Sequence, residues 1–125
     1  MKRITTVLLG LALLVPVGLA GCKTAATAPP LAPGYMNQAD ELMGRTLAGA
    51  HAFYEKIQQQ SAAGTVTLSA GEKVILNDLA QAINAADPAY LAYHNGQGTQ
   101  AAAQAAIDLV STKQAAVQAQ IPGVQ

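Results

Sequence analysis

The sequence predicts an all-α fold, in which residues 35 to 125 form a small antiparallel bundle of three main helices plus one short helix. Two observations carry this prediction. Apolar residues recur three and four positions apart in three separate segments, as they do on one face of an amphipathic helix. Residues that commonly start or stop helices, namely capping Ser and Thr and terminating Pro and Gly, separate these segments.

The first helix is predicted from Met36 to about Gln60. Asn37, Asp40 and Glu41 place hydrogen-bond acceptors and negative charge near the positive end of its dipole. Its apolar face consists of residues at helical spacing and three residues that widen the stripe: Met36, Ala39, Met43, Thr46, Ala50, Phe53 and Ile57, with Leu42, Leu47 and Tyr54. Met36 and Met43 are interpreted as core residues and not as an adaptable binding surface.

The second helix is predicted to start at Ser69-Ala70-Gly71-Glu72, which matches a capping box. Before it, residues 65 to 68 alternate polar and apolar side chains as a short extended segment does, but no partner strand is predicted. The buried face of the helix is expected to contain Val74, Ile75, Leu76, Leu79, Ile83 and Ala86. Asp87-Pro88 is predicted to end the helix, because the residue before a proline disfavours helical geometry.

The short helix is predicted from Pro88 to Asn95 and should stop at Gly96. Thr99 then caps a last helix, which extends to about Gln120 and is terminated by Pro122-Gly123. The inward positions of the last helix are Ala103, Ile107, Val110, Gln114, Val117 and Ile121. Its many alanines favour helix formation but add little burial, so the helix should pack closely against its neighbours.

Residues 1 to 21 have the features of a secretion signal. Lys2 and Arg3 form a positive start, and an apolar stretch from Ile4 to Ala20 follows. This stretch contains Pro16 and is shorter than the roughly 20 apolar residues of a typical membrane-spanning helix. We therefore expect the segment to be removed after export.

Leu19-Ala20-Gly21-Cys22 resembles the lipobox of bacterial lipoproteins, and all four positions match. The resemblance covers only the first 22 residues. It implies cleavage before Cys22, a thioether between Cys22 and diacylglycerol and, in many bacteria, acylation of the new amine. Cys22 is the only cysteine in the chain, so an intramolecular disulfide is excluded. Residue 23 is Lys and not Asp, which by analogy with the lipoprotein sorting rule of enteric bacteria disfavours retention at the inner membrane. For a Gram-negative source, we therefore expect the periplasmic face of the outer membrane.

The chain therefore divides into a signal peptide (1 to 21), a lipidated Cys22 with a tether (22 to 34) and a helical domain (35 to 125). The tether contains Pro29, Pro30 and Pro33, which favour an extended polyproline-like geometry. Disorder is the alternative for this segment.

The charge balance argues against nucleic-acid binding. The whole chain has seven basic and seven acidic residues; without the signal, five basic residues face seven acidic ones, and these five are scattered. Nucleic-acid binding needs clustered Lys and Arg to displace counterions from phosphates. Attachment to the membrane is accordingly expected through the lipid on Cys22.

No motif typical of an enzyme is present, so the chain is predicted to be non-enzymatic and to need no cofactor. A metal site would have to combine His51 and His94 from different helices, completed by Asp87, Glu55 or Asp40. The favoured interpretation places His51 at a helix edge and His94 near a helix C-terminus, where the dipole favours a cation.

Tyr90, Tyr93 and His94 are candidates for a ligand pocket or a partner surface, because their rings carry polar groups. The favoured interpretation is that they cover the end of a small core.

The preferred functional hypothesis is a lipoprotein of the cell envelope whose helical domain docks on another envelope protein. The alternative is a helical-bundle protein that binds a small apolar ligand or a metal ion.

Overall fold

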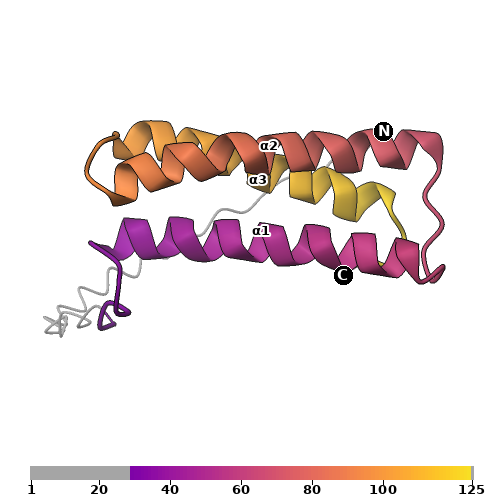
Figure 1. Ribbon diagram of the computed structural model, residues 1–125, viewed down its shortest axis with the longest axis horizontal. Helices are drawn as coiled ribbons and strands as arrows, with labels where there is room; N and C mark the ends of the chain where they lie inside the picture. Colours follow the sequence, from indigo (N-terminus) through magenta and orange to yellow (C-terminus); the bar gives the residue numbers. More distant parts are fainter. Residues whose placement is uncertain (1–28, 125) are drawn as a thin grey trace, which may run out of the picture.

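The computed structural model describes residues 29 to 124, and within that range it is a bundle of three helices (Figure 1). The helices are α1 (Gln38–Ala62), α2 (Ala70–His94) and α3 (Gln100–Gln120). The chain turns back at each connection, so that α2 runs back beside α1 and α3 runs back beside α2. The three-helix bundle is confirmed, whereas the predicted signal peptide, Cys22 and the first part of the tether lie outside the described residues.

Side chains that the sequence places beside each helix start satisfy free backbone N–H groups there. The Asn37 side chain accepts from the N–H of Asp40 at 2.9 Å and caps α1. The predicted capping box of α2 is confirmed, because the N–H of Ser69 donates to Glu72 and the N–H of Glu72 donates to Ser69. The predicted cap of α3 is also confirmed, with Thr99 accepting from Ala102.

The prediction of a separate short helix from Pro88 to Asn95 is wrong. These residues up to His94 continue α2, and Pro88 lies inside the helix. Because proline has no N–H, the carbonyl of Asn84 loses its helical hydrogen bond. Pro88 is exposed, so this carbonyl lies on an exposed part of the helix. Beyond Pro88, side chains of α2 bond to the start of α1, and these tertiary contacts hold the last turns in helical geometry. Gly96, with φ +71°, ends α2 as expected.

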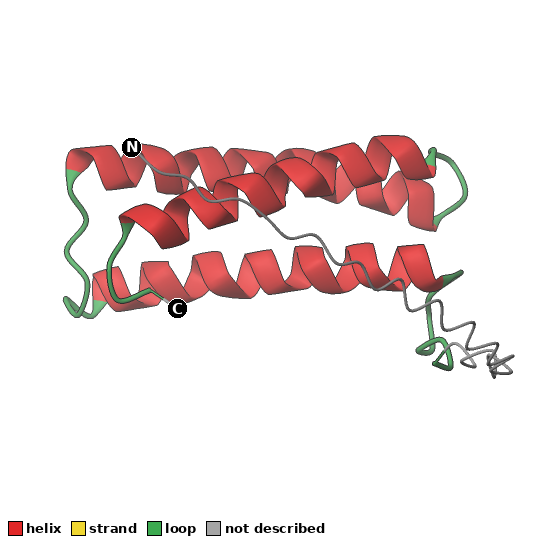
Figure 2. Cartoon of the chain, turned by 180° about the vertical axis from the view of Figure 1, so that it is seen from behind, coloured by secondary structure: helices red, strands yellow, loops and turns green. Residues whose placement is uncertain are grey.

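The described residues contain no β-strand. Figure 2 shows the loops as short connections at the two ends of the bundle. The loop between α1 and α2 includes residues 65 to 68, of which Val66 and Leu68 are half-buried against the core. After α3, a yellow loop in Figure 1 passes toward the C-terminal half of α1. Ile121 and Val124 in this last segment are buried.

All three helices contribute to one hydrophobic core. α2 and α3 pack most closely, because small residues such as Ala82, Ala86 and Ala103 are buried between the helices. The core residues are Met43, Leu47, Ala50, Phe53, Ile57, Leu76, Leu79, Ala82, Ile83, Ala86, Tyr93, Ala103, Ile107, Val110, Val117, Ile121 and Val124.

Three apolar side chains expected in the core are exposed instead: Leu42 (65%), Val74 (61%) and Met36. Ile75 is half-buried and packs against the core, as expected. In the first helix the buried face instead includes Asp40, on the side that meets α2.

None of the helices in the described part of the chain has the length and apolar character needed to cross a membrane.

Candidate functional site

A polar cluster joins the start of α1 to the end of α2. Its centre is Asp40, whose side chain is completely buried. The carboxylate accepts from the N–H of Met36 at 2.8 Å, from Nδ1 of His94 at 2.9 Å and from the hydroxyl of Tyr90. Since an ionised carboxylate only accepts hydrogen bonds, Nδ1 of His94 must carry a proton.

The cluster keeps Asp40 ionised. Burial raises the pKa of Asp40, but the hydrogen bonds from Met36, His94 and Tyr90 and the charge of His94 outweigh burial, and the pKa lies below its ordinary value of 3.8. Burial also raises the pKa of Tyr90 to about 12, with further contributions from Asp40 and Tyr35. Asp40 is therefore a weak proton acceptor at neutral pH, and Tyr90 is a hydrogen-bond donor.

Tyr93 extends the cluster to the third helix. Its hydroxyl accepts from Nδ2 of Asn37 at 2.9 Å and faces the side-chain oxygens of Asn37 at 3.3 Å and of Gln100 at 3.4 Å. Asn37 also caps α1. One tyrosine therefore connects the start of α1, the end of α2 and the start of α3.

Gly44 provides the space that the aromatic rings of this cluster occupy. A Cβ at Gly44 would lie 2.5 Å from the hydroxyl oxygen of Tyr90 and 2.8 Å from a ring carbon of Tyr35. The ring of Tyr90 lies 5.7 Å from that of His94, and the ring of Tyr35 meets His94 edge-on at 6.4 Å. The rings therefore cover this end of the core, in agreement with the favoured interpretation of Tyr90, Tyr93 and His94.

The structure does not bring the two histidines together. His51 pairs with Asp87 at 2.9 Å on a partly exposed surface, whereas His94 pairs with Asp40. Glu55 lies beside His51 at a shallow hollow. Among residues 29 to 124, no three His, Cys, Asp or Glu side chains are grouped as they would be to hold a metal ion.

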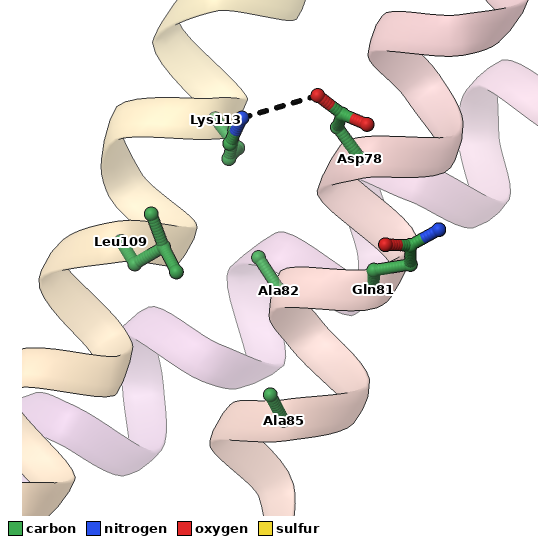
Figure 3. A pocket seen from close by; sticks show the side chains of 6 residues that line it. All are labelled: Asp78, Gln81, Ala82, Ala85, Leu109 and Lys113. Atoms are coloured by element: carbon green, nitrogen blue, oxygen red, sulfur yellow. Dashed lines mark hydrogen bonds and ion pairs between the residues drawn. The ribbon is translucent and has the colours of Figure 1, made fainter.

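A shallow hollow lies between α2 and α3, with a volume of about 240 Å³. Figure 3 shows that Ala82 and Ala85 of α2 lie across from Leu109 of α3. At one end, Nζ of Lys113 bonds to Asp78 at 3.1 Å. Gln81 completes the lining. The sequence does not predict this hollow, because the spacing of Ala82 and Ala85 in the second helix does not show which face of the third helix they meet.

A second hollow lies where the chain enters α1. It is lined by Pro29 and Pro30 of the loop and by Gln38, Glu41, Leu42 and Arg45 of α1. The N–H of Ala32 donates to a carboxylate oxygen of Glu41 at 3.2 Å, and Arg45 pairs with the other oxygen. The described part of the predicted tether thus lies against the first helix.

Comparisons with protein-family models, with curated proteins and with solved structures give no match for this chain.

Proposed function

We propose that this chain is a lipid-anchored protein of the cell envelope, whose antiparallel helical domain docks on another envelope protein and catalyses no reaction. The proposal of a lipid anchor rests on one observation: Leu19-Ala20-Gly21-Cys22 lies at the end of a positively charged and apolar segment. Lipidation of Cys22 also gives a role to the only cysteine of the chain. Two or three acyl chains give stable membrane attachment, because each buried methylene contributes about 0.8 kcal/mol. In a Gram-negative cell, Lys23 favours the periplasmic face of the outer membrane.

The hollow between α2 and α3 supports the docking part of the proposal. Protein interfaces combine an apolar centre with a polar rim. Here Ala82, Ala85 and Leu109 form the apolar part, and the Asp78–Lys113 ion pair lies beside it (Figure 3). Leu109 is exposed although it is a large apolar residue. A partner side chain that fills the hollow would cover Leu109.

The anchor is tested by intact mass and membrane fractionation of the protein expressed in its own host. The wild type should lack residues 1 to 21, carry the added mass of acyl chains and fractionate with the membrane. Cys22→Ala should remain unprocessed and unacylated. A soluble wild type with a free thiol would contradict the anchor.

Docking is tested by a photoreactive amino acid placed at Leu109 in living cells. The matched control is Ala52, an exposed position on α1. We expect one envelope protein to crosslink at Leu109 and not at Ala52. Ala85→Leu, which fills the hollow from an exposed position, should remove the adduct. Equal crosslinking at both positions, or an adduct that survives Ala85→Leu, would contradict docking at this hollow.

A further inference from the structure

Exposed apolar side chains gather where the chain enters α1. Three of the six large hydrophobic residues that are exposed in the described part of the chain fall within residues 31 to 42: Leu31, Met36 and Leu42. Pro29 and Pro30 are also exposed, and they line the same hollow as Leu42. We call these five residues the N-terminal apolar patch. Figures 1 and 2 show the loop before α1 on the side of that helix that faces away from α2 and α3.

The patch is fixed to the helix close to the proposed anchor. The hydrogen bond from Ala32 to Glu41 holds the loop against α1. Pro29, the first described residue, is only seven residues after Cys22. Seven residues span at most about 25 Å even when fully extended. The 25 residues of α1 extend over about 37 Å, so the chain between the anchor and the domain is shorter than the bundle.

The charges around the patch permit close approach to lipid headgroups. Glu41 is paired with Arg45, and the Arg45 side chain is well exposed. Asp40 is buried among its own hydrogen-bond donors. The two carboxylates at this end are therefore both compensated, which limits repulsion from an anionic membrane surface. Tyr35, between the loop and α1, belongs to a residue type that is favoured at membrane interfaces.

We infer that the N-terminal apolar patch contacts the lipid bilayer that holds Cys22; this inference rests on the proposed lipid anchor. The bilayer interface covers Leu31, Met36 and Leu42, so the start of α1 and the end of α2 lie nearest the membrane. The opposite end of the bundle, where α2 begins near Val74, points away from the membrane. The surfaces beyond the patch then remain available for a protein partner.

The experiment uses the full-length acylated protein, purified from membranes of its host and reconstituted in phosphatidylethanolamine and phosphatidylglycerol vesicles. Leu42→Cys and Val74→Cys are each labelled with a small thiol-reactive fluorophore. A thioether at Cys22 leaves no second thiol to react. The two positions are matched, because Leu42 and Val74 are both apolar residues in helices and are exposed to a similar extent (65% and 61%). They lie at opposite ends of the bundle. Quenching by nitroxide-bearing lipids then measures contact with the bilayer.

We expect quenching at Leu42→Cys to be several-fold stronger than at Val74→Cys, and Leu31→Cys to behave like Leu42→Cys. Equal quenching at the two ends, or stronger quenching at Val74→Cys, would overturn the inference. Intact mass on the same samples separates the two proposals. If Cys22 is acylated but Leu42→Cys is not preferentially quenched, the anchor stands and only the patch assignment fails. A free thiol at Cys22 overturns the anchor and the membrane contact together.

Discussion

His94, the last residue of α2, bonds through Nδ1 to the buried carboxylate of Asp40 in the first turn of α1 at 2.9 Å. The same two helices share a second pair, His51 and Asp87, with the same 2.9 Å distance. The pairs differ in environment, because the Asp40 side chain is fully buried whereas that of Asp87 is 36% exposed. Burial, and not distance, should therefore decide how much each pair contributes to stability.

Asp40→Ala should destabilise the domain far more than Asp87→Ala. Removal of the buried carboxylate leaves the N–H of Met36, the hydroxyl of Tyr90 and Nδ1 of His94 without their acceptor. We expect a loss of about 3 kcal/mol in the free energy of unfolding. Asp87→Ala breaks a solvent-screened pair and should cost less than about 1 kcal/mol. Urea unfolding at pH 7, followed by circular dichroism, measures both values. Similar losses in the two variants would show that the polar cluster does not stabilise the helix ends.

The contribution of Asp40 should disappear in acid. Because the pKa of Asp40 is lowered by folding, ionised Asp40 stabilises the folded chain above its ordinary pKa of 3.8. This stabilisation is lost as the pH falls below 3.8 through the lowered pKa. The difference in unfolding free energy between wild type and Asp40→Ala should thus shrink as the pH falls below 3.8. A difference that does not shrink across the acid range in which the wild type remains folded would contradict the lowered pKa.

Tyr90 should produce the opposite dependence at high pH. Folding raises its pKa from 10.0 to about 12, so the protonated hydroxyl stabilises the folded chain below pH 10, and this stabilisation is lost as the pH rises from about 10 to 12. Absorbance at tyrosinate wavelengths should contain a component with a pKa of about 12. Tyr90→Phe should remove that component, and Tyr54→Phe, at a position outside the cluster, should retain it. A component that persists in Tyr90→Phe would assign the raised pKa to another tyrosine.

Two glycines of α1 provide a matched test of packing in the cluster. A Cβ at Gly44 would meet Tyr90 and Tyr35, whereas a Cβ at Gly49 would meet no atom within 4 Å. Gly49→Ala should stabilise the domain by about 0.5 to 1 kcal/mol, because alanine favours helix. Gly44→Ala should instead destabilise it by about 1 to 3 kcal/mol through displacement of the rings.

Thermal unfolding of the two glycine variants gives the sign of each effect. Tyr90→Phe removes the atom that is nearest to the added Cβ. The double variant Gly44→Ala/Tyr90→Phe should therefore be less destabilised than the sum of the single variants. Stabilisation by Gly44→Ala alone would show that the rings move aside without loss.

The sequence was most informative where the interactions are local. Ser69 and Glu72 are neighbours in one turn, as are Thr99 and Ala102, so the caps were predictable from spacing alone. The inward stripe of the last helix was largely predicted in the same way; its buried members are Ala103, Ile107, Val110 and Val117, followed by Ile121, while Gln114 is half-buried.

Interactions between distant residues were not predictable. In the sequence, Asp40 is a carboxylate near a helix start, and its hydrogen-bond partner His94 is 54 residues away. Leu42 reads as part of the apolar stripe, but it lies on a part of α1 that the other helices do not cover. The hollow between α2 and α3 depends on which faces of two helices meet, and spacing within one helix does not determine this.

Pro88 was misinterpreted as a helix boundary for the same reason, and it provides a last prediction. A proline in a helix interior removes one hydrogen bond and costs about 3 kcal/mol relative to alanine in isolated helices. In this domain the contacts of Tyr93 and His94 with α1 keep α2 continuous past the proline. Pro88→Ala restores the missing N–H at an exposed position and should raise the free energy of unfolding by about 1 to 3 kcal/mol. Asp40→Ala removes one of these contacts and should make the helix after Pro88 open more often. Faster amide hydrogen exchange at residues 89 to 94 would detect this opening. If Pro88→Ala is neutral or destabilising, the proline has a favourable role in the folded helix that these contacts do not explain.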